Sequence, residues 1–303
     1  MMAVIKNFVV GKSAGSYQNT ETYAFVESLA EADIVLNHAA PAQHSAETKA
    51  ALEAGKHVYC AAPLAASFSE ANELTRLAAE KGLLLCAGSC DFLNTSLQGV
   101  RRLLEEDVVG KPFAAAVKLF RRTDADLTAE ACLFITVLMS LFGAVKSVSG
   151  MSAGAHYAGV LRFAGGEIAT VTFSCNTCSM PNTNCLEVYA ARGNLALDEP
   201  GGTIRIKIGD EDTLPADGSW GGGKWLPIDS PYSDPRQDDS ICLGLADMIA
   251  ALRDNRAPRA NAQQALHALE VLSAIERSQA EGREIAITTP YERGPVLSLV
   301  ETF

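Results

Sequence analysis

The sequence lacks a long apolar stretch and is poor in basic residues. No run reaches the roughly 20 apolar residues that a membrane-spanning helix needs, and the start, Met1–Lys6, does not resemble a signal peptide. Lys and Arg number 25 against 36 Asp and Glu, which gives a net charge of −11. The electrostatic field of this negative net charge repels phosphate groups and anionic lipid, so we expect no nucleic-acid and no membrane partner.

Motifs for several kinds of chemistry are also missing. The sequence contains no complete phosphate-binding loop of the Gly-x-x-x-x-Gly-Lys-Ser/Thr kind and no nucleophile elbow. Cys175 and Cys178 have the spacing of a zinc pair, but no second pair completes a site, so we predict no metal. Without export signals, the eight cysteines are expected to be reduced thiols of a cytoplasmic protein.

What is present is an ordinary globular composition, with 48% hydrophobic and 20% charged residues in a chain of 303. This length suits two domains. In the first third, apolar runs alternate with helical patterns, which is typical of βαβ units around a parallel sheet. We predict strands at 4–10, 33–37, 57–60 and 83–87, and helices at 20–32, 45–54, 69–81 and 96–106.

From Lys111 onward the pattern changes to short strands at hairpin spacing, which favours a mostly antiparallel sheet. Strands are expected at 113–121, 145–149, 156–163, 167–174, 184–190 and 284–288, and helices at 128–142, 241–253 and 262–280. The predicted fold class is α/β, with an incomplete Rossmann-like parallel sheet followed by an α+β domain with an open sheet. The expected domains are 1–110 and 111–303.

Several segments carry a family resemblance. The run 51–60, Ala-Leu-Glu-Ala-Gly-Lys-His-Val-Tyr-Cys, with the preceding Pro41–His44 turn, resembles the Gfo/Idh/MocA family of sugar and inositol dehydrogenases. Residues 141–148, 186–189 and 244–260 resemble the second domain of that family. The resemblance implies a Rossmann half, an NAD(P) cofactor, a sugar-like substrate and a homo-oligomer that pairs through the second domain's sheet.

The residues that this family uses for chemistry are replaced here. Family enzymes carry Glu-Lys-Pro after the strand at 57–60, where this sequence reads Ala61-Ala62-Pro63, so the lysine is absent. The family's helical Asp-x-Gly-x-His falls on Ala129, Ala131 and Leu133. None of these three side chains can transfer a proton, and loss of either site is expected to cost orders of magnitude in rate.

The dinucleotide motif is also incomplete. A Rossmann fold uses Gly-x-Gly-x-x-Gly after its first strand and an acidic residue about 20 positions later. The nearest match here begins at Gly11 and ends at Gly15, with Ser13 at the middle glycine's place. Residues 4–10 are either a surviving first strand that feeds directly into the helix at 20–32, or the end of a lost unit. In both cases no residue is an obvious candidate for the carboxylate that binds the adenosine ribose.

The candidate site residues follow from these comparisons. Gly11, Gly15, Pro41 and His44 are the candidates for cofactor binding, and NAD(P) is the cofactor that the resemblance implies, although the residues themselves favour none. Asp124, Asp126 and Tyr157 are the candidate replacement acids, and no residue is assigned as catalytic. The charge run at 121–126 is either a ligand-lining loop or a solvated surface segment.

These observations favour a catalytically degenerate oxidoreductase, a pseudoenzyme with a role in binding or assembly. Its ligand would be small, polar or sugar-like, and a protein partner is an alternative. A second hypothesis is an NAD(P)-dependent sugar or cyclitol oxidoreductase with a rearranged site. A third is a non-redox lyase or isomerase that uses the cleft between the domains.

Overall fold

A computed structural model describes residues 5–11, 23–88, 95–122, 124, 126–176, 183–198, 204–208, 226–227 and 240–294. The chain forms two compact units: residues 1–90 with 239–270, and residues 91–238 with 271–303. No helix in the described part is both long and apolar enough to cross a membrane. The two units are described in turn.

The first unit is built on a parallel sheet of five strands in the order β2-β1-β3-β4-β5. Its strands are β1 (Ile5–Val10), β2 (Tyr23–Phe25), β3 (Ile34–Asn37), β4 (His57–Cys60) and β5 (Leu85–Ala87). The strands from β3 to β5 are buried on both faces, which explains their continuous apolar sequence. The predicted parallel Rossmann-like sheet is confirmed.

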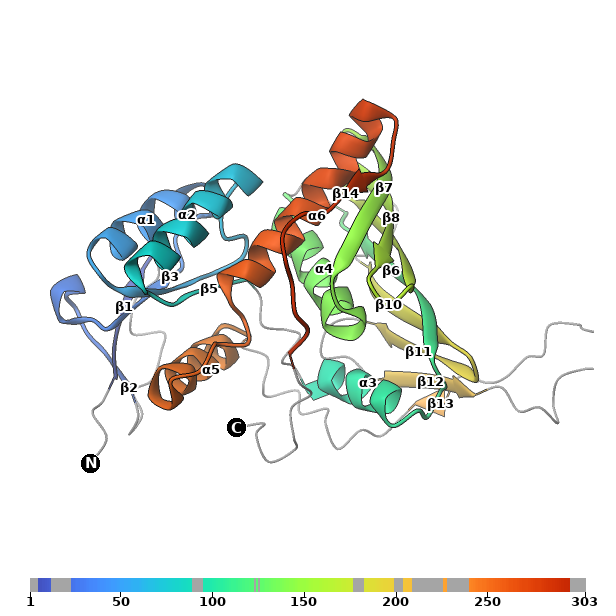
Figure 1. The fold of residues 1–303 in the computed structure, drawn as a ribbon, viewed down its shortest axis with the longest axis horizontal. Helices are drawn as coiled ribbons and strands as arrows, with labels where there is room; N and C mark the ends of the chain where they lie inside the picture. Colours follow the sequence, from blue (N-terminus) through green and yellow to red (C-terminus); the bar gives the residue numbers. More distant parts are fainter. Residues whose placement is uncertain are drawn as a thin grey trace, which may run out of the picture. The chain divides into compact units, whose positions relative to one another are not determined.

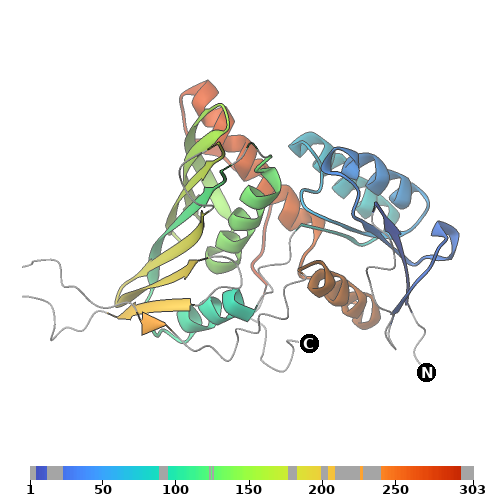
Figure 2. The same cartoon turned by 180° about the vertical axis from the view of Figure 1, so that it is seen from behind.

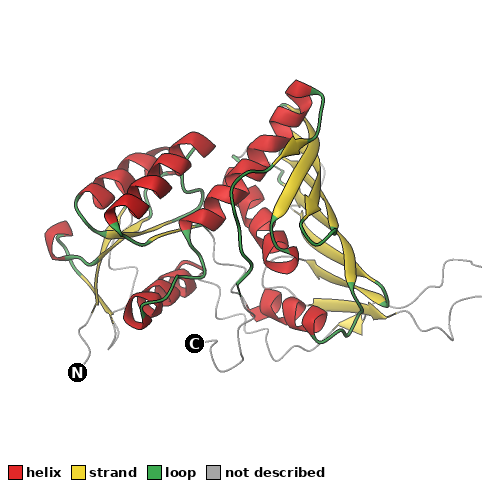
Figure 3. Cartoon of the chain, in the orientation of Figure 1, coloured by secondary structure: helices red, strands yellow, loops and turns green. Residues whose placement is uncertain are grey.

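Helices cover both faces of this sheet (Figures 1 and 3). Helices α1 (His44–Glu53) and α2 (Phe68–Lys81) lie on one face, and α5 (Ser240–Asp254) lies on the other. Helix α2 is capped at its start by Ser67, whose hydroxyl accepts from the Glu70 N–H, and at its end by Gly82 in the left-handed conformation that glycine adopts most readily.

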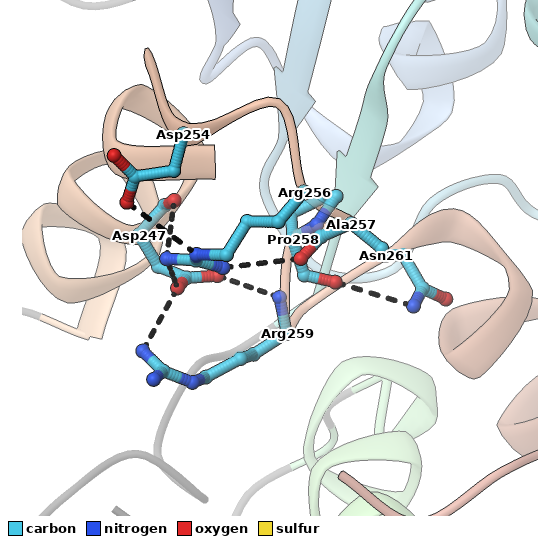
Figure 4. Close-up of polar contacts among 7 residues, drawn as sticks. All are labelled: Asp247, Asp254, Arg256, Ala257, Pro258, Arg259 and Asn261. Atoms are coloured by element: carbon cyan, nitrogen blue, oxygen red, sulfur yellow. Dashed lines mark hydrogen bonds and ion pairs between the residues drawn. The ribbon is translucent and has the colours of Figure 1, made fainter. Parts of the chain in front are cut away.

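A buried carboxylate fixes the turn between α5 and α6 (Ala262–Glu281), whose first residues, 262–270, belong to this unit. The side chain of Asp247 is 1% exposed and accepts from Arg256 at 2.7 Å and from the Arg259 guanidinium at 3.1 Å. It also accepts from the Arg259 backbone N–H at 2.6 Å (Figure 4). Asn261 then caps α6 through the Gln264 N–H. These contacts hold the turn in one conformation.

One sequence prediction is wrong in this unit. The helix expected at 20–32 is replaced, within the described residues, by strand β2 and a short 3-10 helix, Leu29–Glu31. Tyr23, Ala24 and Phe25 pair with Ile5, Lys6 and Asn7. The backbone groups of β1 need partners on that side, and aromatic residues suit a strand, so this long-range pairing overrides the local helical pattern.

The strand order explains how this sheet relates to a complete dinucleotide fold. A complete fold has the order 3-2-1-4-5-6. Removal of its second strand and renumbering gives 2-1-3-4-5, the order observed here. Strand β1 lies between β2 and β3, so it takes the place of a first strand, as the first of the two alternatives for residues 4–10 expects. The helix that this alternative placed directly after it, at 20–32, is not formed within the described residues. The chain places β2 on one side of β1 and then β3, β4 and β5 on the other side, so the strand order reverses between β1 and β3.

The second unit contains a nine-stranded, mostly antiparallel sheet in the order β13-β12-β11-β10-β6-β9-β8-β7-β14, in which only β6 and β9 are parallel neighbours. Its strands are β6 (Pro112–Phe120), β7 (Val145–Ala153), β8 (His156–Phe163), β9 (Ile168–Ser174), β10 (Thr183–Ala190), β11 (Gly193–Asp198), β12 (Ile204–Ile208), β13 (Leu226–Pro227) and β14 (Ile285–Ala286). The predicted antiparallel open sheet is confirmed.

Helices α4 (Thr128–Phe142) and α3 (Thr95–Glu105) and the second part of α6 lie on one face of this sheet, as Figures 1 and 2 show. Helix α4 is apolar on nearly all sides and is buried over most of its length, as its sequence predicts. Gly150 allows α6 to approach, because a Cβ there would lie 2.8 Å from the Ile275 Cγ2 atom. The other face is open and exposes Met151, Val160 and Ile168.

The compact units differ from the division at residue 110 that the sequence suggested. The chain changes unit near residue 90, and α5 with the start of α6 returns to the first unit. The physical reason is that α5 packs beside β4, while Asn261 forms a bridge with Cys86 of β5. A change in the periodicity of the sequence cannot show this return of the chain.

Candidate functional site

The carboxyl ends of β1 and β3 mark the point where an open α/β sheet binds ligands. Gly11 follows β1 with φ of +92°, and a Cβ at this position would lie 2.4 Å from the His38 carbonyl oxygen and 2.5 Å from Ala39. Only glycine fits so close to the next strand's backbone. The first glycine of a dinucleotide motif also forms a tight turn after the first strand, and the assignment of Gly11 to cofactor binding stays a prediction. Gly15 lies outside the described residues.

His44 and Pro41 lie at the same edge, after β3. Pro41 is exposed at the start of a 3-10 helix, Pro41–Gln43, and His44 is buried as the first residue of α1. The two ring nitrogens of His44 lie 2.6 Å from the Pro63 carbonyl oxygen and 3.0 Å from that of Ala39. The ring therefore joins the ends of β3 and β4, and its assignment to a cofactor pocket stays a prediction.

The position of the missing lysine lies in the loop after β4. Ala62 is half-buried there and precedes Pro63, with a cis peptide bond between them. The carbonyl group of Pro63 is the one that His44 contacts, so the loop is held in place by the fold itself. The loop is thus positioned by His44, but it presents a methyl group where the family resemblance implies an ammonium group.

The second set of replaced residues lies on α4. Ala129 and Leu133 are half-buried and Ala131 is buried. The helix carries one carboxylate, Glu130, which is engaged by the Arg121 guanidinium at 2.8 and 3.1 Å. Burial raises the pKa of the Cys132 thiol to about 12, with a smaller contribution from Asp126, so this thiol stays protonated. Helix α4 therefore offers no unengaged acid or base near neutral pH.

The structure brings two of the three candidate acids together. Asp126 caps α4 by accepting from the Thr128 N–H at 2.9 Å, and its charge acts on Tyr157. Burial raises the pKa of Tyr157, with further contributions from a hydrogen bond and charge of Glu276, from Asp126 and from Cys175. Tyr157 therefore keeps its proton and can act as a hydrogen-bond donor.

Asp124 is connected to Tyr157 only through another residue, Cys175. The Cys175 thiol contacts its carboxylate at 3.7 Å, which places both near Tyr157. Asp126 of the loop before α4 and Glu276 of α6 therefore both act electrostatically on the Tyr157 phenol of β8, and Asp124 is connected to this cluster through Cys175. Sequence reasoning missed Glu276 because this residue lies far along the chain, in a helix whose amphipathic pattern gives no sign of a site.

A groove of about 600 Å³ lies beside Tyr157 at the end of the sheet. Its wall includes Phe120, and its polar groups include His156, whose Nδ1 atom lies 2.5 Å from the Ser174 hydroxyl oxygen. This volume and the mixture of apolar surface with a few polar groups are typical of small-molecule sites. His156 and Ser174 were not predicted, because their pairing depends on the register of β8 and β9.

Comparisons with known proteins agree with this geometry. The model of the oxidoreductase family with an NAD-binding Rossmann fold, Gfo/Idh/MocA, matches residues 6–89. This chain is therefore similar to the Gfo/Idh/MocA oxidoreductases over residues 6–89. Among curated relatives, 1,5-anhydro-D-fructose reductase of Ensifer adhaerens is 37% identical over 76 residues, which are 24% of this chain and 22% of that protein. The chain covers between 21% and 50% of the curated relatives that it matches.

Solved structures of oxidoreductases match the fold over most of the chain. Aldose-aldose oxidoreductase of Caulobacter crescentus, complexed with glycerol, matches with a TM-score of 0.75 at 16% identity, over 94% of this chain and all of that chain. Levoglucosan dehydrogenase, in complex with NADH and L-sorbose, matches with a TM-score of 0.76 at 14% identity, over 95% of this chain and all of that one. At this identity the likeness concerns the fold alone.

Proposed function

We propose that this protein is a catalytically degenerate Gfo/Idh/MocA oxidoreductase, a pseudoenzyme that uses the family scaffold to bind a small polar or sugar-like ligand or a partner. The observation that supports the proposal is the chemistry of three positions. Ala62, Ala129 and Leu133 stand where the resemblance implies a lysine, an aspartate and a histidine.

The missing groups matter because alcohol oxidation has two parts. A hydride leaves the carbon for the nicotinamide, and the hydroxyl proton must move to a base. A positioned acid or base contributes roughly 10²–10⁴-fold to such a step. Glu130 is paired with Arg121, and the Cys132 thiol is protonated, so no neighbour on α4 takes the histidine's place.

A nicotinamide nucleotide is the ligand that the first unit suits best. Gly11 provides the close turn after β1 that a pyrophosphate-binding loop requires. When bound, the nucleotide would supply the redox chemistry, and this chain's part would be to hold it. Binding without turnover is consistent with the degenerate reading of the second unit.

The cluster around Tyr157 supports a second candidate, an NAD(P)-dependent sugar or cyclitol oxidoreductase with a rearranged site. Tyr157 keeps its proton and hydrogen bonds with Glu276, so it could return a proton to an alkoxide. This alternative requires that Tyr157→Phe abolish a measurable activity. The third hypothesis, a lyase or isomerase, would use the same cluster without nucleotide.

The experiment that tests the proposal restores the missing groups. We expect purified wild-type protein to show no substrate-dependent reduction of NAD⁺ or NADP⁺ with a panel of aldoses, polyols and inositols. The triple variant Ala62→Lys, Ala129→Asp and Leu133→His should gain activity, whereas a control with Ala62→Met, Ala129→Asn and Leu133→Phe should not. Robust wild-type turnover would contradict the proposal and favour the rearranged enzyme.

The open sheet of the second unit supports a further part of the proposal, a homo-oligomer. Met151 is 67% exposed on that face, and Val160 and Ile168 lie exposed on neighbouring strands. Large apolar side chains clustered on a sheet face are typical of interfaces. Light scattering should report a dimer or larger species, and Met151→Glu with Val160→Glu should yield monomers. A monomeric wild type would refute this part.

A further inference from the structure

The carboxyl ends of the strands in the first unit do not all lie at one level. Strands β1, β3, β4 and β5 end together, because their pairing places four residues side by side: Val10, Asn37, Cys60 and Ala87. Strand β2 stops earlier, since its last pair joins Phe25 to Asn7 and the Val26 N–H donates to the Asn7 carbonyl at 2.8 Å. At about 3.3 Å per residue, the step from Asn7 to Val10 leaves the end of β2 about 10 Å short of the common edge.

This difference matters for a dinucleotide, which uses both halves of its fold. A complete fold consists of two mononucleotide-binding halves, with strands 3-2-1 on one side of the crevice and strands 4-5-6 on the other. The second half is retained here as β3, β4 and β5, whereas β2 is the last described strand on the far side of β1. From Phe8 to Val10, β1 pairs only with β3 within the described part of the chain. The described residues therefore provide no strand end that could support the adenosine half of NAD(P).

The retained edge, in contrast, is held in place by buried contacts. Asn37 is fully buried, and its side-chain nitrogen donates to the His44 carbonyl at 3.0 Å while its side-chain oxygen accepts from the Ala39 N–H at 3.2 Å. The Tyr59 hydroxyl donates to the Gly88 carbonyl at 3.1 Å. These contacts fix the turns after β3 and β5 without a ligand, so little conformational freedom remains to be lost on binding.

The surface of this edge is small-sided and suits a flat ring. Four alanines that are exposed or half-buried follow β3 and β4: Ala39, Ala40, Ala61 and Ala62. Their methyl groups provide apolar contact for the face of a heteroaromatic base. At Gly11 a Cβ would lie 2.4 Å from the His38 carbonyl oxygen, and the absence of a side chain there lets a phosphate group approach the backbone closely.

We propose that this edge binds a mononucleotide, that is, one flat heteroaromatic base with its ribose and a single phosphate group, and that the adenosine half of NAD(P) adds no affinity. The flavodoxin-like fold has the same strand order, 2-1-3-4-5, and holds FMN at the same reversal between β1 and β3. This inference rests on the proposed nucleotide site of the first unit and narrows the ligand from a dinucleotide to a mononucleotide. It does not depend on whether turnover occurs.

The test is a calorimetric titration of the full-length protein with four probes: reduced nicotinamide mononucleotide, FMN, NADH and AMP. We expect at least one of the two mononucleotides that carry a redox-active base to bind. NADH should bind no more than about threefold more tightly than reduced nicotinamide mononucleotide, because its additional half finds no described strand end. AMP at millimolar concentration should neither bind nor compete.

A pair of charge variants locates the binding site. Ala40 is exposed directly above the end of β3 and precedes a 3-10 helix, a position where aspartate is well tolerated. Ala40→Asp places a negative charge beside the phosphate and should weaken mononucleotide binding at least about fivefold. Ala50→Asp, an equally exposed substitution in the last turn of α1, is the matched control and should leave the affinity unchanged. Thermal unfolding of each variant checks that the fold is retained.

The outcomes separate this inference from the proposed function. NADH binding more than about threefold tighter than that of reduced nicotinamide mononucleotide overturns the inference, as does binding of AMP. Equal affinities of Ala40→Asp and wild type also overturn it, and so does the absence of binding of all four probes at millimolar concentration. Substrate-dependent turnover by wild type would refute the degenerate function, whereas the ratio of the affinities would still decide between mononucleotide and dinucleotide.

Discussion

The turn between α5 and α6 gives the most direct test of how the first unit is held together. Asp247 is almost fully buried and is the shared acceptor for two guanidinium groups and one backbone N–H (Figure 4). Replacement of Asp247 with Ala would remove all three hydrogen bonds at once. The Arg259 backbone N–H would be among the donors left without this acceptor. The guanidinium groups of Arg256 and Arg259 would face each other without the negative charge of Asp247 between them.

The cost can be worked out from these contacts. Breaking a buried ion pair by removing one partner costs about 3–5 kcal/mol. The Arg256 and Arg259 side chains are 32% and 22% exposed, so water can solvate part of their charge. We therefore expect the lower end, about 3 kcal/mol. For a unit of this size, that loss lowers Tm by roughly 10 °C.

The assay is urea and thermal unfolding followed by far-ultraviolet circular dichroism. Asp247→Ala should lower the midpoint of the transition that belongs to the first unit. Asp247→Asn keeps one acceptor oxygen and the shape, so its loss should be about half as large. A change below about 0.5 kcal/mol in Asp247→Ala, the size of an ordinary surface substitution, would refute the reasoning.

Three further predictions concern single residues. Asn7 is fully buried, and neither of its amide atoms has a hydrogen-bond partner among the described residues, so Asn7→Leu should raise the free energy of unfolding by about 1–3 kcal/mol. A lower free energy of unfolding would contradict this expectation. Gly150→Ala should destabilise by about 1–3 kcal/mol through the clash with Ile275, and Ile275→Ala should remove part of that coupling in a double-mutant cycle. Burial lowers the pKa of His57, although the charge of Asp33 opposes this shift, and the Nδ1 atom of His57 accepts from the Leu84 N–H. The free energy of unfolding should therefore fall as the pH drops below 6.5, and it should fall less in His57→Gln.

The sign of the His57 effect follows from linkage. A folded-state pKa below the ordinary value means that the unfolded chain binds the proton more readily. The stabilisation is therefore complete above pH 6.5 and is lost as the pH falls through the lowered pKa. Urea unfolding at pH 7.5 and pH 5.5, compared between wild type and His57→Gln, isolates the contribution. Equal pH dependence in the two proteins would contradict it.

Elements with strong local signals could be predicted from the sequence. Helix α4 has the predicted bounds, Thr128–Phe142, because its apolar residues occur on every face and Gly143 ends it. Strands β3 and β4 were found because short apolar runs between turn signals identify strands buried on both faces. The alternation of strand and helix then indicated the fold class of the first part, and the short strands at hairpin spacing indicated that of the second.

Contacts between distant residues could not be predicted. Tyr23–Phe25 reads locally as part of a helix, and only the unpaired side of β1 makes it a strand. The same holds for the site, because Glu276 had no local signal. The replaced positions Ala62, Ala129 and Leu133 were visible because they depend on an aligned motif rather than on packing.

The central claim is that the positions expected to move a proton carry methyl and isobutyl groups. The most direct measurement is the absorbance change at the nicotinamide wavelength when pure wild-type protein is mixed with NAD⁺ or NADP⁺ and saturating aldoses, polyols or inositols. We predict a rate equal to that of a protein-free control, even where calorimetry shows that NADH binds. A substrate-dependent rate that scales with protein concentration and survives repurification would contradict the account.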